Sequence, residues 1–317
     1  MIKCSGCGAI LQNIDNNKEG YTDNLDKPLC KRCFRITHYN EYITVDKDGD
    51  EFTQKLKFIS STNDLVILTV DLINMIDFDK LDISNPILLV FTKRDILPKN
   101  IYEDKILSKI KTNLNIVDKM FISSMNNYNL DELLLKVKKY KKSDNVYLIG
   151  LTNSGKSTLI NKLIKNYSDN LNYITVSNLP STTLDFIKRV IDGITFIDTP
   201  GLLDDVLSEE YLKKVTPVRV INPIVYQIKT DQIITVEDFL RIDVPKDNIL
   251  IFYMSNSLKI NRFYKEKDNL KNLKKSIIRI NAEEDLVIKG LGFIKFKKDS
   301  RVIIYSNFKH FIRKSII

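Results

Sequence analysis

The sequence predicts an α/β core flanked by two smaller parts of different composition. Three observations support this prediction. All four cysteines lie in the first 33 residues, short apolar runs alternate with polar stretches from residue 62 to 200, and shorter β-leaning runs follow residue 215. A length of 317 residues fits two or three domains of average size. We therefore expect three domains, at residues 1–58, 59–215 and 216–317.

The composition is that of a globular protein without a membrane anchor. Apolar residues make up 43% and charged residues 28% of the chain. No apolar run approaches the roughly 18 residues that span a bilayer. The first residues, MIKCSGCGAI, lack the patterns of signal and transit peptides. We expect a cytoplasmic location, no membrane contact and a monomer.

The N-terminal segment carries two CxxC steps, Cys4 with Cys7 and Cys30 with Cys33. Each step can bring two thiolates to one tetrahedral centre, so the four predict a structural zinc site in a treble-clef-like knuckle. The spacer is slightly longer than the commonest pattern. Disulfides are disfavoured in the cytosol, and a redox pair needs no second copy. Because so polar a segment buries little surface, zinc would contribute about 10 kcal/mol to its folding.

Basic and aromatic residues surround the second CxxC step, in the stretch CKRCFRITHYNEY. Lys31, Arg32 and Arg35 lie near Phe34 and Tyr39, which suits contact with an RNA backbone and stacked bases. A solvated knuckle surface explains the same composition equally well.

The central segment predicts a mostly parallel sheet. Its strands are short runs that are apolar on both faces, as in buried parallel sheets, at residues 65–70, 86–91, 119–122 and 145–149. Residues 186–191 and 194–198, separated by Asp192-Gly193, predict one antiparallel hairpin.

Helices are predicted between these strands at residues 100–115 and 129–142. Asn129 opens the second helix and the lysine cluster 138–142 closes it. Lysines at a helix C-terminus complement its dipole, and we favour this interpretation over a nucleic-acid patch.

The segment after residue 215 predicts a small β-rich or α+β domain that is basic. Residues 216–317 hold 20 Lys and Arg against 11 Asp and Glu, which accounts for the whole net charge of +9. The stretch 289–298, KGLGFIKFKK, is the best candidate for an RNA-binding surface. A half-buried strand with alternating residues gives the same pattern. No internal repeat is evident.

Residues 150–157 read GLTNSGKS and fit the phosphate-binding pattern G-x-x-x-x-G-K-[ST]. The motif follows an apolar strand and opens a helix, where backbone N–H groups can point at phosphates. Lys156 would reach the β and γ phosphates, and Ser157 would ligate Mg²⁺. Further nucleotide contacts are expected from Asn153, Ser154, Gly155 and Thr158.

Two other motifs extend the phosphate site. DTPG at 198–201 ends a strand, where Asp198 can hold Mg²⁺ through water and the Gly201 amide can sense the γ-phosphate. LPSTTLD at 179–185 supplies a hydroxyl that closes over the metal when a third phosphate is present. Either threonine of this motif fits, and we prefer Thr183 to Thr182.

TKRD at residues 92–95 also follows an apolar strand. Asp95 can accept hydrogen bonds from N1–H and the 2-amino group of guanine, and adenine offers neither, so the motif predicts GTP rather than ATP. Lys93 would stack its stem on the base next to Thr92. A solvated charge cluster is the alternative for this motif alone. Base contacts are also expected after the strand 119–122, from Ser123, Ser124 and Met125.

The motifs occur in an unusual order along the chain: base reader, base loop, phosphate loop, threonine switch, magnesium aspartate. Joining the last to the first restores the usual order of guanine nucleotide domains. The sequence therefore predicts a circular permutation with its ends just after DTPG, as surface termini permit. The segment that responds to the γ-phosphate then leads directly into the C-terminal domain.

The two CxxC steps, the permuted set TKRD, SSM, GLTNSGKS, PSTTLD and DTPG, and the basic tail together resemble the bacterial YqeH family of ribosome-assembly GTPases over essentially the full chain. The resemblance implies a circularly permuted P-loop GTPase domain that hydrolyses GTP to GDP. It also implies action in maturation of the small ribosomal subunit and its 16S rRNA, with RNA or ribosome binding by the flanking domains. Thr92 replaces the family's usual Asn, and Ser124 and Asn127 replace small Ala and Gly residues.

Intrinsic hydrolysis is expected to be slow. Leu202 follows DTPG, where Ras-like enzymes place a glutamine that orients the attacking water. Asn153 matches a position that, in similar GTPases, helps to hold potassium beside the β and γ phosphates. An asparagine chosen for loop geometry is the alternative. We expect Lys156, Thr183 and Asn153 to be the catalytic residues.

Two functions from different classes fit these motifs. The first is a GTPase switch that binds ribosomal RNA through its C-terminal domain. The second is a nucleotide-gated adaptor that recognises protein and hydrolyses GTP incidentally. A steep salt dependence of ribosome association favours phosphate contacts, and a flat one favours the adaptor.

Overall fold

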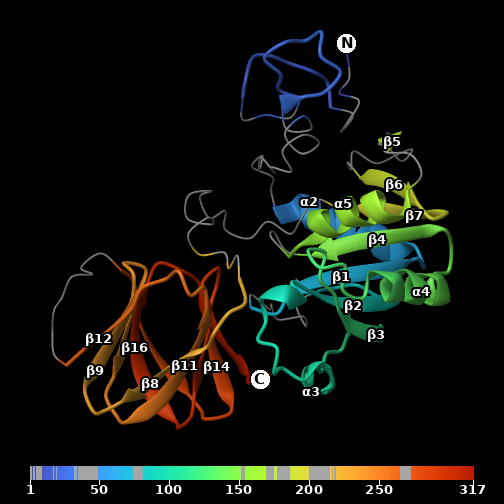
Figure 1. Cartoon of the computed structure of the whole chain (residues 1–317). Helices are drawn as coiled ribbons and strands as arrows, with labels where there is room; N and C mark the ends of the chain where they lie inside the picture. The colour runs from blue at the N-terminus through green and yellow to red at the C-terminus, as the bar shows by residue number, and fades with distance from the viewer. Residues whose placement is uncertain are drawn as a thin grey trace. The chain divides into compact units, whose positions relative to one another are not determined.

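The computed structural model of the chain describes three parts: an N-terminal segment, a central α/β sheet and a C-terminal β-domain (Figure 1). The described residues are 2, 4, 9–16, 18, 20–31, 34, 49–73, 81–150, 154–168, 175–176, 186–199, 215, 217, 219–264 and 273–317.

The central sheet has seven strands in the order β3-β2-β1-β4-β7-β6-β5 (Figure 1). The pairs β1–β4, β2–β3 and β4–β7 are parallel, and β5–β6 and β6–β7 are antiparallel. The strands are β1 (Leu65–Asp71), β2 (Ile87–Thr92), β3 (Ile116–Phe121), β4 (Asn145–Gly150), β5 (Thr175–Val176), β6 (Ile187–Ile191) and β7 (Ile194–Asp198). The predicted parallel strands and the hairpin of β6 and β7 are confirmed, and β5 adds a second antiparallel pair that was not predicted.

The hairpin between β6 and β7 turns at the residues that the sequence indicates. Asp192 has a φ of 52° and Gly193 a φ of 73°. Two consecutive positive φ values match the turns that follow the right-handed twist of paired strands, and Asp-Gly adopts them readily. This turn fixes the register in which Ile187 faces Asp198.

Four α-helices are described: α2 (Gly49–Ser61), α3 (Glu103–Lys109), α4 (Leu130–Tyr140) and α5 (Lys156–Tyr167). A 3-10 turn, η2 (Arg94–Ile96), follows β2. The helix predicted at 129–142 corresponds to α4, with Asn129 as its N-cap. Lys138 and Lys139 lie in its last turn, and Lys138 pairs with Asp192 at 2.7 Å.

The helix predicted at 100–115 is shorter than expected. Ile110 already leaves the helical region, with φ −73° and ψ 107°. The Thr112 hydroxyl accepts the N–H of Leu114 at 3.2 Å. A threonine that bonds its own neighbouring backbone competes with the helix, which explains the early end.

The C-terminal domain consists of ten strands in two antiparallel sheets. One sheet has the order β12-β9-β10-β16-β13 and the other β17-β14-β15-β11-β8. Its described residues, 219–264 and 273–317, contain no helix. The strands are β8 (Ile224–Ile228), β9 (Gln232–Val236), β10 (Leu240–Val244), β11 (Asn248–Met254), β12 (Ile260–Phe263), β13 (Lys275–Ile280), β14 (Glu284–Ile288), β15 (Gly292–Phe296), β16 (Ser300–Ser306) and β17 (His310–Lys314).

The two sheets reveal an internal duplication, which corrects the expectation that the chain has no repeat. Strands β9, β10 and β11 begin at residues 232, 240 and 248, and β14, β15 and β16 begin 52 residues later in each case. The strand pairing repeats with the same offset of 52 residues. Leu240 faces Ser306, and the equivalent residues Gly292 and Met254 also face each other. Each sheet therefore combines three strands of one copy with two of the other.

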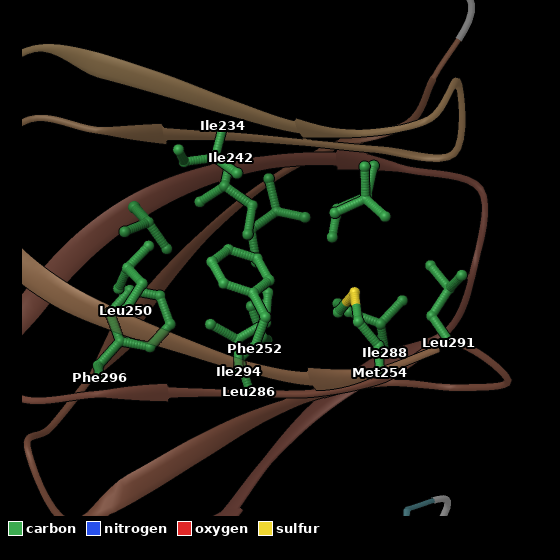
Figure 2. Close-up of a cluster of buried hydrophobic side chains, with 14 of the residues drawn as sticks. Ile234, Ile242, Leu250, Phe252, Met254, Leu286, Ile288, Leu291, Ile294 and Phe296 are labelled. Atoms are coloured by element: carbon green, nitrogen blue, oxygen red, sulfur yellow. The ribbon is translucent and has the colours of Figure 1, made fainter. Parts of the chain in front are cut away.

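The core between these sheets is apolar on both sides (Figure 2). Ile234 and Ile242 of one copy occupy the positions of Leu286 and Ile294 in the other, and all four are fully buried. The duplication escapes sequence inspection because the copies share this alternation of apolar residues rather than the residues themselves.

The chain divides into two compact units that are interleaved in sequence. The first comprises Met1–Val70, Asp77–Thr92 and Thr112–Val206, and the second comprises Asp71–Ile76, Lys93–Lys111 and Leu207–Ile317. The segments that follow β1 and β2 thus belong to the same compact unit as the C-terminal domain. Among the described residues, none of the helices combines the length and apolar character that crossing a bilayer requires.

Candidate nucleotide-binding site

The phosphate loop connects β4 to α5, as its motif predicts. Gly155 is the N-cap of α5 and has a φ of 83°, a conformation that favours glycine. A Cβ on Gly155 would lie 3.3 Å from Thr92, and one on Gly150 would lie 2.1 Å from the Thr69 hydroxyl. Both glycines therefore allow a close approach of backbone that larger residues would block. Asn153 lies outside the described residues.

Two threonine hydroxyls from neighbouring strands hold the phosphate loop. Thr69 of β1 shares a hydrogen bond of 2.8 Å with the hydroxyl of Ser154. Thr92 of β2 donates to the carbonyl of Ser154 at 2.6 Å. Both threonines are buried. The first residue of TKRD thus anchors the phosphate loop, and Thr69 is an anchor that no sequence motif indicated.

Lys156, the first residue of α5, lies beside Asp198, the last residue of β7. The Lys156 ammonium donates to the Thr199 carbonyl and lies 3.6 Å from Asp198 Oδ1. Thr199 is held in turn, because its hydroxyl donates to the Leu148 carbonyl at 2.7 Å. The lysine of one predicted motif and the carboxylate of another are therefore neighbours in the first compact unit.

Three buried charged residues, Lys156, Asp198 and Lys55, set the electrostatics of this site. Burial lowers the pKa of Lys156, and the positive charge of Lys55 lowers it further, whereas Asp198 raises it. Lys55 lies on α2 and is only 3% exposed. No sequence motif indicated Lys55. The one feature of the sequence that could have indicated it is a lysine on the apolar side of an amphipathic helix. Two buried ammonium groups and one buried carboxylate together carry a net positive charge, which favours an anion.

The donor set at this site fits Mg²⁺ and phosphate. Ser157, in the first turn of α5, offers a hydroxyl, and the buried Asp198 offers a carboxylate. Mg²⁺ prefers such hard oxygen ligands and keeps several waters. The N-terminus of α5 and the buried lysines supply positive potential for phosphates. Thr183 and Gly201, the predicted switch residues, lie outside the described residues.

The base-reading motif continues from Thr92 into the second compact unit. Lys93 has a left-handed backbone, with φ 57° and ψ 38°. Its ammonium pairs with Asp71 Oδ2 at 3.0 Å. Asp95 is half-buried within the turn η2, and Arg94 pairs with Glu103 at 2.5 Å. The two residues before Asp95, Lys93 and Arg94, are therefore each held by an ion pair.

The predicted base loop follows β3 in a closed turn. Ser123 is buried and exchanges backbone hydrogen bonds with Tyr128 at 3.0 and 3.1 Å, and its hydroxyl accepts the N–H of Asn126. Asn127 has a φ of 56°, which explains how asparagine replaces a glycine here. Ser124 is half-exposed and Met125 is exposed. Ser123 thus shapes the turn, while the next two residues face outward.

The N-terminal segment brings two of the four predicted zinc ligands together. Cys4 and Cys30 are buried, and the N–H of Cys30 donates to Cys4 Sγ at 3.1 Å. Cys7 and Cys33 lie outside the described residues. Within the described part of the chain, no group of three or more His, Cys, Asp or Glu is placed to hold a metal. The four-cysteine zinc site stays a prediction.

Comparisons with known proteins agree with this geometry. A family model described as 50S ribosome-binding GTPase matches residues 145–286. YqeH of Bacillus subtilis is 29% identical over 363 aligned positions, which cover 100% of this chain and 99% of that protein. NO-associated protein 1 of Arabidopsis thaliana is 29% identical over 244 positions, 63% of this chain and 43% of that protein.

GTPase Der of Mycoplasma mycoides is a more distant match, 29% identical over 224 positions, which cover 62% of this chain and 50% of that protein. The full-length match to YqeH and the matches to GTPases over the phosphate-loop region agree with the site built from Lys156 and Asp198. The chain is thus similar to YqeH over its full length, and to a GTPase family model and an NO-associated protein over part of it.

Proposed function

We propose that this protein is a GTP-hydrolysing switch that acts in ribosome assembly, in maturation of the small subunit and its 16S rRNA. The observation that carries the GTPase part is the meeting of Lys156, Asp198 and Thr199 beside a phosphate loop held by Thr92. The small subunit follows from the resemblance to the YqeH family. The matching family model carries a description that names the 50S ribosome, so a test must compare both subunits.

In this proposal the chain's own groups position GTP for hydrolysis. Ser157 and Asp198 hold Mg²⁺, which when bound offsets the charge of the β and γ phosphates. Lys156 contacts the same phosphates, and Thr183 and Gly201 close over the γ-phosphate. Because Lys156 and Asp198 already lie side by side in a buried position, they stabilise developing charge with little reorganisation.

Slow intrinsic turnover is part of the proposal. Leu202 is apolar, so it cannot orient the attacking water as the glutamine of Ras-like enzymes does. Asn153 is proposed to help hold potassium, which would stabilise transition-state charge as an arginine finger does. Equal rates in potassium and sodium buffers would contradict that role.

A circular permutation and three domains, at 1–58, 59–215 and 216–317, complete the proposal. The parallel pairing of β1 with β4 supports the permutation, because β1 precedes the phosphate loop in the chain yet lies directly beside the strand that carries it. The strand that carries TKRD, β2, is the next in the sheet.

The structure changes which surface we propose for RNA. In the stretch 289–298 the two phenylalanines, Phe293 and Phe296, are fully buried. They cannot stack on bases, so the half-buried-strand interpretation of this stretch holds. A different surface is both basic and exposed: Lys275 and Arg279 of β13 beside Arg301 of β16.

This β13–β16 surface has the features of a nucleic-acid contact. Arg279 faces Arg301 directly across the strand pair, and Lys275 faces Tyr305 in the same register. The Lys275 ammonium lies 5.9 Å from the centre of the Tyr305 ring. Two facing arginines repel each other unless an anion lies between them, which suits a phosphate backbone.

Ribosome association tests the proposal. We expect the protein to sediment with the small subunit when a non-hydrolysable GTP analogue is bound and to leave it with GDP. The double variant Arg279→Glu/Arg301→Glu should reduce association at least about tenfold and flatten its salt dependence, since each lost phosphate contact lowers the slope by about one.

The matched control is Lys139→Glu/Lys142→Glu, which changes the charge equally at two exposed lysines at the end of α4. It should bind like the wild type. Association with the large subunit instead would replace the small-subunit assignment. Association that is insensitive to both salt and the arginine variant would favour the protein-binding adaptor.

The zinc prediction has its own test. We expect about one zinc per chain by elemental analysis, and we expect Cys4→Ser and Cys30→Ser each to lose it. Loss of the metal should unfold the N-terminal segment, because metal binding supplies most of its stability. The zinc prediction would be wrong if the protein contained no zinc and its mass were about two units below that of the reduced chain for each cysteine pair, because that mass indicates disulfides.

A further inference from the structure

The strongest unassigned feature of the second compact unit is a row of alternating charges that runs from the base-reading loop into the C-terminal domain. Lys93 pairs with Asp71 at 3.0 Å, and Arg313 pairs with Asp285 at 3.5 Å. Arg313 Nη1 also donates to the carbonyl of Leu72 at 3.0 Å. The row therefore contains two cations and two carboxylates in alternation.

The central link of this row is a tight turn after β1. Asp71 Oδ1 accepts the N–H of Ile73 at 3.0 Å, while its Oδ2 accepts the Lys93 ammonium. Leu72, between these two residues, is the one whose carbonyl Arg313 holds. Arg313 of β17 thus holds the backbone next to Asp71, the residue that pairs with Lys93.

Arg313 is itself buried and stacked on an aromatic ring. It faces Asp285 directly in the pairing of β17 with β14, and its guanidinium lies 4.5 Å from the centre of the Phe293 ring. The side chains of Arg313 and Asp285 are 7% and 0% exposed. Burial lowers the pKa of Arg313 to about 10, and the charges of Asp285 and Asp71 raise it. A buried, stacked guanidinium has few alternative rotamers, so it fixes what it binds.

A buried ion pair between two strands would serve stability less well than an apolar pair of similar size. An ion pair at this position is therefore explained better if the guanidinium also has a second role. The hydrogen bond from Arg313 to the Leu72 carbonyl is such a role. Lys93 needs such support, because a left-handed backbone is unfavourable for a lysine and its long stem loses rotamer freedom when it is ordered.

We propose that Arg313 is a positioning residue for the base-reading loop: by holding the Asp71–Ile73 turn it keeps Lys93 in place for guanine, and it makes nucleotide affinity depend on the C-terminal domain. Coupling of this kind is reciprocal, so a partner that moves β17 would change GTP and GDP affinity. The inference rests on the proposed role of residues 92–95 as the guanine reader.

The experiment is a double-mutant cycle on GDP affinity. Asp285→Asn/Arg313→Met removes the buried charges together, which avoids leaving a single unpaired charge. Asp71→Asn keeps the oxygen that accepts the Ile73 N–H and removes the charge that holds Lys93. We expect each change to weaken GDP binding about 5- to 20-fold, with kcat at saturating GTP within about twofold of the wild type.

The decisive outcome is the combination of the two changes. If Arg313 acts through Asp71, the combined variant binds GDP no more weakly than Asp71→Asn alone. Multiplied effects would show that Arg313 has a merely structural role and would overturn the proposal, as would unchanged affinity in a folded variant. Arg279→Met, an exposed arginine in the same domain, is the control and should bind GDP normally.

A further variant covers the case in which Asp285→Asn/Arg313→Met does not fold. Arg313→Lys keeps a charge beside Asp285, but one ammonium cannot replace a fork that serves Asp285 and Leu72 together. It should weaken GDP binding and leave the unfolding midpoint nearly unchanged, and normal binding would refute the proposal. Failure of the wild type to prefer guanine nucleotides would instead refute the proposed base reader.

Discussion

Replacing Lys156 with alanine is expected to weaken GTP binding at least about 100-fold and to abolish measurable hydrolysis. The ammonium lies buried beside Asp198 and Thr199, where water is excluded and a phosphate contact is strong. Loss of one partner of a buried charge pair costs 2–5 kcal/mol, and about 1.4 kcal/mol corresponds to tenfold in affinity. Calorimetric titration with GTP and GDP, with a phosphate-release assay, measures both effects.

The stability of this variant separates binding from folding. Burial and the charge of Lys55 lower the pKa of Lys156 in the folded state. A lysine whose folded-state pKa is lowered opposes folding at every pH where the unfolded chain carries its proton, including neutral pH. The unfolding midpoint of Lys156→Ala should therefore change little, because removing a buried ammonium offsets the loss of its pairing with Asp198.

Lys165→Ala, at an exposed position in the last turn of the same helix, is the matched control. It should bind GTP normally. Wild-type affinity in Lys156→Ala would remove the lysine from the phosphate site. A large fall in its midpoint would mean that lost structure explains the lost binding.

Replacing Asp95 with asparagine is expected to exchange guanine for xanthine. In the proposed base reader the carboxylate accepts two hydrogen bonds from guanine, and an amide turns one acceptor into a donor that suits the 2-carbonyl of xanthine. A buried polar group without its partner costs enough that such sites discriminate by factors of about 10⁴ or more. GTP affinity should fall at least about 100-fold, while affinity for xanthosine triphosphate should rise by a similar factor.

Competition between the two nucleotides for the wild type and the variant measures this exchange. The control is Asp104→Asn, an exposed aspartate on α3 in the same compact unit, which should keep the preference for GTP. Unchanged selectivity in Asp95→Asn would show that the carboxylate does not read the base, even if the phosphate site functions.

Local patterns in the sequence were enough to place most of the elements. The runs at 65–70 and 86–91 became β1 and β2 because their residues are buried on both faces, a pattern that depends on neither partner nor register. The phosphate loop was equally readable, since Gly150, Gly155 and Lys156 must stand at fixed spacing for backbone N–H groups to face a phosphate. Helix α2 and the end of α3 were missed or misplaced.

The internal duplication shows where this reading fails. The two copies keep buried apolar positions, such as Ile242 and Ile294, but change most other residues. A sheet core demands alternation and volume rather than identity. The repeat therefore became visible only when the strands of both copies paired in matching register.

The sequence by itself determined the chemistry of this protein, because phosphate binding and base reading need particular residue types at short spacing along one loop. Only the tertiary structure decided which side chains support those loops. Thr69 and Thr92 reach the phosphate loop from other strands, Lys55 comes from a helix about 100 residues upstream of Lys156, and Arg313 comes from the last strand. Such supports are joined through space, and a sequence records spacing along the chain, not distance across the fold.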